Sequence, residues 1–350
     1  MKRTLVTVLL IFIMLLGMTP VAGATDILPE MLIDSTWYGE YTGYYGSDLV
    51  QRYMNMKIET CDSTGKITGK GYVTTVPGQG YDDQWINYEF KGEIDLSTGD
   101  CWMQGTKEIS SGGDLNWNFA KFEGSFSYDD VKGTVDGYTN RTFYYARTSE
   151  WAMDEITEAN SLGLIPETLK GKDLTKPISR AEFAAVCATA YEKLTDAEIS
   201  PFTGYKFVDI DGNENEDYIR RAYAVNIAVG TSDKTFEPDK NLSRQEMATM
   251  LARIIKKYKF TDWTYATDSD YYLDTSGVQK FSDDDLIADW AKPSVYYLYK
   301  LQVIKGMSEN PPIFAPYNST ADEEAILYAT STRQQAILLA LRVYKISNMI

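Results

Sequence analysis

A short pattern that begins a helix occurs three times, and it constrains the fold of this chain more than any other feature. It reads Ser179-Arg180-Ala181-Glu182, Ser243-Arg244-Gln245-Glu246 and Thr332-Arg333-Gln334-Gln335. In each copy the hydroxyl group can accept a hydrogen bond from the backbone N–H three residues on, and the Glu or Gln there can reach back to the N–H of the cap. Apolar residues at helical spacing follow each copy. The sequence therefore predicts three capped helices of similar construction.

An arginine occupies the first helical position in all three copies: Arg180, Arg244 and Arg333. The helix dipole disfavours a cation at this end of a helix. Three such placements indicate that the guanidinium groups and the first backbone N–H groups together hold an anion.

The copies share more than their helix starts. A shorter apolar helix precedes each of them, and when these are aligned on Ile156, Ile219 and Val295 the arginine follows after 24, 25 and 38 residues. The second and third copies also carry a Phe-x-Asp and a Gly followed by Phe-x-Pro, at Phe207-Val208-Asp209, Gly230, Phe236-Glu237-Pro238, Phe281-Ser282-Asp283, Gly306 and Phe314-Ala315-Pro316. Repeats of this length are typical of arrays whose units bury their apolar faces against one another.

In these motifs, residues 147–346 resemble the S-layer homology family of cell-wall anchoring modules. The resemblance implies three modules in a pseudo-trimer, a central bundle of the capped helices, and grooves that bind a pyruvylated secondary cell-wall polysaccharide. It places the binding residues at Arg180, Arg244, Arg333, Asp209, Asp283, Trp151, Trp290, Gly230 and Gly306.

The three repeats differ from this pattern in ways that affect their grooves. The first has no Phe-x-Asp, and the second has Glu214 at the position of the tryptophan. The third has Gln335 in place of Glu and an insertion at about residues 319–330. We therefore do not expect every groove to bind.

Residues 1–24 are predicted to be a signal peptide, with Lys2 and Arg3 before an apolar run at 5–16 and a small-residue cleavage site at 22–24. The run is short for a membrane span, so we expect a secreted protein at the cell wall or S-layer that does not insert in the membrane after cleavage.

The formal net charge of −16 becomes more negative without the peptide. Such a chain repels nucleic acid, and an acidic polysaccharide must be bound through local arginines. Self-association in a surface layer stays open.

Residues 25–147 are predicted to form an antiparallel β domain. Strand-like runs lie at 36–45, 49–61, 66–76, 85–95, 100–109, 115–128 and 131–145, separated by turn sequences. Short successive connections favour a meander closed into a small up-and-down barrel, with a β-sandwich as the alternative. We expect domains at 1–24 (signal peptide), 25–147 (β domain), 148–200, 201–260 and 261–350 (repeats 1, 2 and 3).

The composition limits the chemistry. The absence of histidine excludes Ser-His-Asp and Cys-His catalysis and most zinc sites, and no cofactor is expected. Cys187 is expected in a helix core, whereas pairing of Cys61 with Cys101 stays open. The main expectation is a non-enzymatic β domain displayed by the wall anchor. The alternatives are a ligand-binding barrel, or glycan hydrolysis by carboxylates such as Glu40, Glu89, Glu93 and Asp136.

Overall fold

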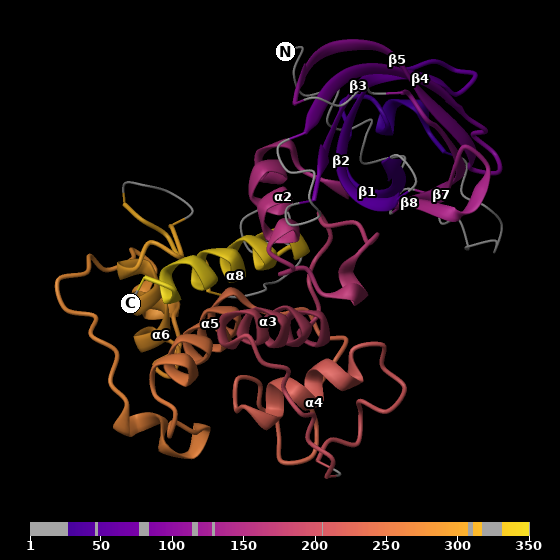
Figure 1. Ribbon diagram of the computed structural model, residues 1–350. Coiled ribbons are helices and arrows are strands. Elements are labelled where there is room, and N and C mark those ends of the chain that lie inside the picture. The colour runs from indigo at the N-terminus through magenta and orange to yellow at the C-terminus, as the bar shows by residue number, and fades with distance from the viewer. Residues whose placement is uncertain are drawn as a thin grey trace, which may run out of the picture.

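The computed structural model describes residues 27–45, 48–76, 84–113, 118–127, 130–204, 206–306, 311–316 and 331–349. It shows a closed antiparallel β-barrel followed by a helical region (Figure 1). The predicted signal peptide and the insertion in repeat 3 lie outside the described residues. Among the described helices, none has the length and apolar character that a membrane span requires.

The barrel is an up-and-down meander in which each strand pairs with the next and β8 closes on β1. Its strands are β1 (Thr36–Tyr45), β2 (Asp48–Cys61), β3 (Lys66–Thr75), β4 (Trp85–Ile94), β5 (Asp100–Gly112), β6 (Lys121–Phe126), β7 (Asp130–Val135) and β8 (Tyr138–Thr148). The predicted barrel is confirmed, and the alternative sandwich is wrong. The predicted run 131–145 is two strands, because Asp136 and Gly137 both adopt positive φ, 51° and 72°, and form the hairpin turn between them.

Alternate residues of the strands fill the barrel. The interior side chains include Trp37, Met54, Phe90 and Tyr145, all buried. The cavity between Met56, Tyr88, Phe122 and their described neighbours measures about 10 Å³, which is about the space that one water molecule needs. This part of the barrel has no room for a ligand, so the ligand-binding alternative has no support in the described interior.

The three cysteines are free and buried. Cys61 ends β2 and Cys101 lies near the start of β5, with β3 and β4 between these strands in the barrel. Cys187 is fully buried in a helix core, as expected.

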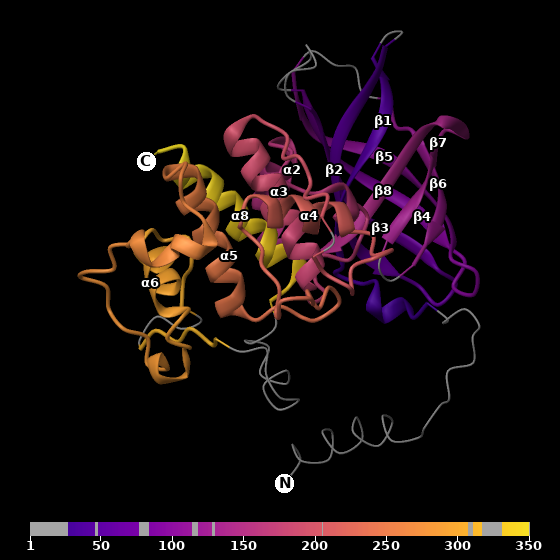
Figure 2. The same ribbon diagram turned by 90° about the horizontal axis from the view of Figure 1, so that it is seen from below.

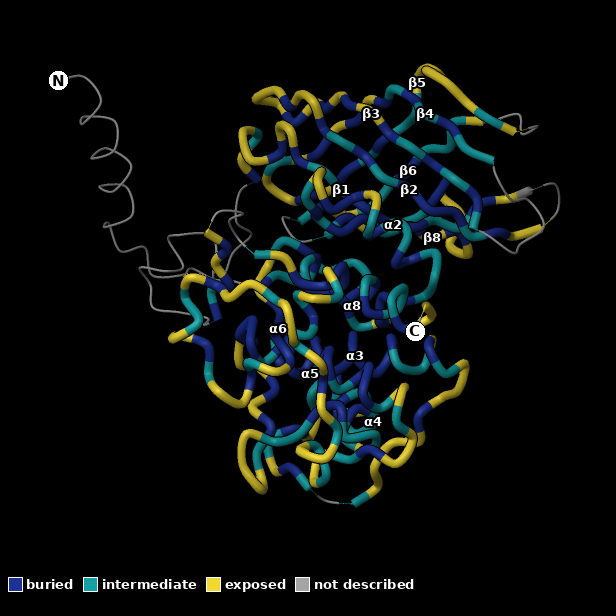
Figure 3. Tube along the Cα trace, turned by 90° about the vertical axis from the view of Figure 1, so that its left-hand side faces the viewer, coloured by how far each residue is buried: buried dark blue, intermediate teal, exposed yellow. Residues whose placement is uncertain are grey.

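The helical region has the threefold plan that the repeats predict. Its long helices are α3 (Arg180–Thr195), α5 (Arg244–Lys259) and α8 (Arg333–Ser347), and its short helices are α2 (Met153–Ser161), α4 (Glu216–Ala224) and α6 (Lys292–Lys300). The 3-10 turns are η1 (Pro29–Met31), η2 (Glu150–Ala152), η3 (Glu167–Leu169), η4 (Tyr265–Asp270) and η5 (Asp284–Leu286). The long helices pack on one another at the buried centre (Figure 3).

Each short helix packs on the long helix of the preceding repeat. Helix α4 packs on α3, α6 packs on α5, and α2 packs on α8. The chain order therefore closes into a ring, because repeat 1 contacts repeat 3. Each repeat completes its core with residues of a neighbour.

The barrel is joined to repeat 1 almost without a linker, since β8 ends at Thr148 and η2 begins at Glu150 (Figure 2). The Arg147 carbonyl accepts a hydrogen bond from the Leu174 N–H at 2.8 Å. The buried Glu40 carboxylate of β1 accepts one from Asn160 Nδ2 of α2 at 2.5 Å. The two parts thus pack directly on each other.

The barrel closure predicts a specific sensitivity at Gly39, which pairs with Tyr145 across the β1–β8 seam. A Cβ atom there would lie 1.8 Å from the Tyr144 carbonyl oxygen, so Gly39→Ala must push the two backbones apart. We expect a loss of about 1–3 kcal/mol in the free energy of unfolding, the usual cost of overpacking, measured by urea denaturation. The control is Ser125→Ala on exposed strand surface, expected to change it by less than about 0.5 kcal/mol. Equal stability of the two variants would contradict the seam geometry.

Candidate functional site

The three predicted capping boxes are present. Ser179 Oγ accepts from the Glu182 N–H at 3.2 Å, and Glu182 Oε2 accepts from the Ser179 N–H at 3.1 Å. The boxes of α5 and α8 repeat this reciprocal pair. The local prediction for the helix starts is confirmed.

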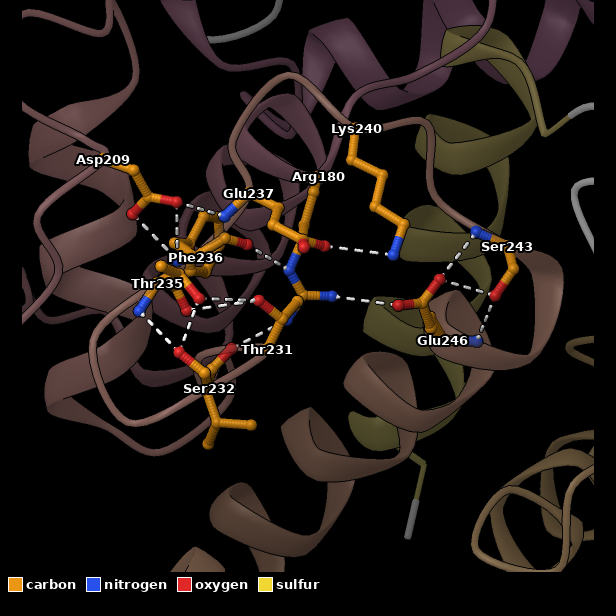
Figure 4. A network of polar contacts seen from close by, with 11 residues as sticks. Arg180, Asp209, Thr231, Ser232, Thr235, Phe236, Glu237, Lys240, Ser243 and Glu246 are labelled. Atoms are coloured by element: carbon orange, nitrogen blue, oxygen red, sulfur yellow. Dashed lines mark hydrogen bonds and ion pairs between the residues drawn. The ribbon is translucent and has the colours of Figure 1, made fainter.

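Arg180 extends into repeat 2 rather than toward solvent (Figure 4). Its Nε donates to the Phe236 carbonyl at 2.9 Å and its Nη2 to the Val229 carbonyl at 2.7 Å. Its Nη1 lies 3.3 Å from Oε1 of Glu246, the capping residue of α5. The guanidinium also lies 4.9 Å from the Phe236 ring centroid. Arg180 therefore joins repeat 1 to repeat 2.

Arg244 joins repeat 2 to repeat 3 in the same way. Its Nε donates to the Phe314 carbonyl at 2.8 Å, its Nη2 to that of Lys305 at 3.5 Å, and the guanidinium lies 5.2 Å from the Phe314 ring. Burial lowers the pKa of Arg244 to about 10, although the nearby negative charge of Asp283 acts to raise it. The side chain is still a cation at neutral pH.

Arg333 closes the ring from repeat 3 to repeat 1. Its Nε and Nη2 donate to the two carboxylate oxygens of Glu182 at 3.1 and 2.8 Å, and its Nη1 donates to the Asp173 carbonyl at 2.9 Å. Lys172 Nζ adds a contact of 3.3 Å to Glu182. We call the contact of each of these arginines with the next repeat a seam. The seam between repeats 3 and 1 is held by an ion-pair cluster, whereas the other two include a phenylalanine ring.

The first N–H groups of α3 and α8, where an anion was expected, have internal partners. The N–H groups of Arg180 and Ala181 donate to the carbonyls of Lys240 and Pro238, and those of Arg333 and Gln334 to Lys176 and Leu174. The third N–H donates to the capping hydroxyl. The expectation that these arginines and N–H groups hold an external anion stays a prediction without support in the described contacts, because at α3 and α8 the neighbouring repeat already uses both.

The two predicted aspartates also have internal partners. Asp209 accepts from the N–H groups of Phe236 and Glu237, and Asp283 from those of Phe314 and Ala315, at 2.7–3.0 Å (Asp209 in Figure 4). They hold loops in which Glu237 and Ala315 adopt positive φ, 58° and 55°. The expectation that they accept from sugar hydroxyls is not supported.

The two predicted glycines lie in the same loops. A Cβ at Gly230 would lie 2.4 Å from the Ser232 carbonyl oxygen. Gly306 follows Lys305, whose carbonyl accepts from Arg244. Both glycines therefore belong to the seams between repeats.

Trp151 and Trp290, in contrast, are available to a ligand, with 61% and 57% of their surfaces exposed. Each lies at the third position of the same tight turn, closed by Ala152 N–H to Ser149 in repeat 1 and by Ala291 N–H to Ala288 in repeat 3. In repeat 2, Glu214 takes this position and forms an ion pair with Lys172.

A groove of about 500 Å³ lies beside Trp290, between α5 and α6. Its lining comes from three segments. Trp290 and Pro293 belong to the start of repeat 3, Arg253 and Lys256 to α5, and Tyr265 to η4. Among the expected residues, only Trp290 lines this groove. Sequence reasoning missed Arg253, which follows Arg244 by nine residues and lies within the apolar stretch 250–255 of α5.

Arg253 is a cation with no carboxylate partner among the described residues. Its Nη1 donates to the Ile227 carbonyl at 3.3 Å, and its guanidinium lies 4.9 Å from the Tyr265 ring centroid. Burial lowers its pKa. Lys256, one turn further along, is paired with Asp268 at 2.6 Å. The groove thus combines a guanidinium that has no ion-pair partner among the described residues with an exposed indole.

At the equivalent position of α8, the cations are neutralised. Arg342 Nε and Nη2 donate to both oxygens of Glu155 at 3.0 and 2.8 Å, and Lys345 pairs with Glu158 at 2.6 Å. Trp151 belongs to the repeat that supplies these two glutamates.

Between repeats 1 and 2, α3 has Thr189 at the position of Arg253, and Glu192 pairs with Arg221 at 3.3 Å. Glu40 and Tyr53 of the barrel line this groove, which measures about 410 Å³. The three equivalent positions around the ring therefore differ in charge.

The four carboxylates named from the sequence do not lie together, but Glu93 lines a hollow of about 640 Å³ on the barrel with Asp95, Asp100 and Glu123. Glu89 and Glu93 lie on the outer face of β4, Asp136 pairs with Arg141 at 2.9 Å in the β7–β8 turn, and Glu40 lies at the junction with repeat 1. Within the described ranges, no group of three or more Cys, Asp or Glu residues is placed to hold a metal ion.

Comparison with known families finds the S-layer homology domain at residues 206–248 and 280–310. These stretches hold both Phe-x-Asp motifs, the start of α5 and the turn that presents Trp290.

Several curated proteins are similar over part of this chain. An exoglucanase, XynX, of Acetivibrio thermocellus is 29% identical over 182 residues, 51% of this chain and 15% of that protein. A cellulosome-anchoring protein of the same species is 28% identical over 42% of this chain and 35% of its own length. An S-layer protein of Bacillus licheniformis is 28% identical over 41% of this chain and 17% of its own length.

This chain spans about a third or less of the length of each of these relatives. The likeness to the exoglucanase therefore does not carry that enzyme's activity to this chain. The matched domain, the anchoring protein and the S-layer protein agree on a place at the cell surface, in the cell wall or S-layer. The chain carries S-layer homology domains, built into a ring of three repeats behind a closed β-barrel.

Proposed function

We propose that this protein is held non-covalently at the cell wall by an acidic secondary polysaccharide bound in the groove between repeats 2 and 3. A pyruvyl ketal is the proposed acidic group, and its carboxylate would meet the Arg253 guanidinium. Trp290 would stack on the face of a neighbouring sugar ring. The β-barrel is the part displayed at the surface.

One observation carries this proposal: Arg253, a half-buried guanidinium without an ion-pair partner among the described residues, lies in the same groove as an exposed tryptophan. A desolvated guanidinium recognises a carboxylate through strong charge-assisted hydrogen bonds. An exposed indole supplies a flat apolar face of the kind that sugar rings cover.

The other two grooves support binding less well. Binding of an acid beside Trp151 would require it to displace Glu155 or Glu158 from the cations of α8. The groove between repeats 1 and 2 has neither the tryptophan nor the arginine. We therefore assign Trp151 a secondary contribution.

Glycan hydrolysis remains a less favoured alternative. The chain shares partial identity with proteins named as glycosidases, but the four candidate carboxylates named from the sequence do not lie together. A paired acid and base within about 5–10 Å is what such chemistry needs.

The proposal predicts that Trp290→Ala weakens retention on purified wall polysaccharide about tenfold. Arg253→Gln should weaken it by about ten- to a hundredfold, because it removes a charge-assisted contact. Co-sedimentation with the polymer measures both.

Trp151→Ala is the matched control, because it removes an equally exposed tryptophan of the same turn, and we expect a smaller loss. Polymer freed of its pyruvyl ketals by mild acid should bind wild type and Arg253→Gln equally weakly. Full retention of the Trp290→Ala, Arg253→Gln double variant would overturn the proposal.

The contribution of the seam arginines to stability can be tested separately from ligand binding in the groove. Burial alone would raise the pKa of Glu182, but hydrogen bonds from Arg333 and the Ser179 N–H outweigh it, so this pKa lies below its ordinary value. The ion pair is therefore fully stabilising above about pH 4.3, the unfolded value, and is lost as the pH falls through the folded pKa.

We expect Glu182→Gln to cost about 3 kcal/mol at pH 7, the low end for a buried pair because Arg333 and Lys172 are partly exposed. The thermal midpoint of the helical signal should fall by roughly 6–12 °C, and the difference from wild type should shrink in acid.

Glu158→Gln is the control. It breaks an exposed pair between the same two repeats and should change the thermal midpoint little. Folded Glu182→Gln should still bind wall polymer. Selective loss of binding with an unchanged midpoint would assign these arginines to the ligand instead.

A further inference from the structure

The two repeats that present a tryptophan each follow, around the ring, a long helix with a feature that the long helix before repeat 2 lacks. The residue after the seam arginine is glutamine in α5 and α8, Gln245 and Gln334, but alanine in α3, Ala181. Both glutamines are buried, at 5% and 4% exposure. A buried amide at the second position of a helix needs a partner.

In both cases that partner is the turn carrying the tryptophan of the next repeat. Gln245 Oε1 accepts from the Ala288 N–H at 3.0 Å, and Gln334 Oε1 accepts from the Ser149 N–H at 2.9 Å. Ala288 and Ser149 each lie two residues before the tryptophan, Trp290 or Trp151. The contact therefore fixes the first residue of the turn that exposes the indole.

Repeat 2 is the internal control within the chain. Its equivalent N–H, that of Gly212, donates to Glu216 Oε2 of its own repeat at 3.1 Å. The turn that follows is different, since the Asn215 N–H donates to the Asn213 side chain at 2.9 Å. Where the preceding helix has alanine, the turn closes on itself and carries Glu214.

We infer that Gln245 is a positioning residue for Trp290, and Gln334 for Trp151: each glutamine holds, from the preceding repeat, the turn that sets the direction of the indole. Neither glutamine touches the ligand. For its effect on wall binding, this inference rests on the proposed function. For the orientation of the indole, it stands on the geometry alone.

The test uses the full-length secreted chain labelled with fluorotryptophan, whose resonances are assigned with Trp290→Phe and Trp151→Phe. Gln245→Met keeps the side-chain volume but removes the acceptor. We expect it to shift the Trp290 fluorine resonance and leave that of Trp151 in place. Gln334→Met should do the reverse. Gln245→Glu, which keeps the acceptor oxygen, should restore the resonance of Trp290.

Ala288→Pro removes the same hydrogen bond from the donor side. The residue before it, Ile287, is extended (φ −75°, ψ 124°), as a following proline requires. It should move the Trp290 resonance as Gln245→Met does, so the test survives if either variant folds poorly. An unmoved Trp290 resonance in a folded variant of either kind would overturn the inference.

Retention on wall polysaccharide supplies the second readout. Gln245→Met should weaken it about fivefold, the effect of one lost hydrogen bond, but should have no further effect in a Trp290→Ala background. An equal loss in both backgrounds would overturn the positioning role. If the resonance moves and Trp290→Ala leaves retention unchanged, the positioning role is upheld and the proposed function fails.

Discussion

A guanidinium group that reaches from the first turn of one long helix into the next repeat is the contact on which the helical region depends. Each long helix gives one such arginine and lies beside a short helix of the next repeat. The cap carboxylate has two roles, since Glu182 and Glu246 each close a capping box and also accept an arginine from the preceding repeat. Helix capping and ring closure thus share the same atoms, which explains why arginine stands at a position that the helix dipole disfavours.

The departures among the repeats follow from this shared role. In α8 the cap residue is the neutral Gln335, and Arg244, which comes from the preceding repeat, is bound by the carbonyls and the ring of repeat 3 instead of a cap carboxylate. Repeat 1 has Lys172 where the others have phenylalanine, and Arg333 there forms a bidentate pair with Glu182. A cation over an aromatic ring and a cation on a carboxylate are both effective partners for a buried guanidinium.

The sequence predicted those parts of the structure whose signals are local. Capping boxes, hairpin turns and alternating strands depend on residues a few positions apart, and the three helix starts and the meander barrel were found from them. Whether Arg180 points to solvent or into a neighbour depends on residues such as Phe236 and Glu246, which lie far along the chain. Helical spacing therefore could not decide it. Arg253 was missed because one arginine within the apolar stretch 250–255 gives no signal until the facing helix is placed.

The charge of the chain explains why the groove between repeats 2 and 3 differs from the others. A protein with a formal net charge of −16 repels an acidic polymer at long range, so attraction must come from a cation at contact distance. Pairing Arg342 and Lys345 with glutamates, as at α8, strengthens the ring but leaves no charge for a ligand. Arg253 is held instead by a carbonyl and a tyrosine ring, partners that fix the guanidinium without neutralising it. Stability at one contact between repeats and the proposed recognition in the groove thus depend on the same residue type with different neighbours.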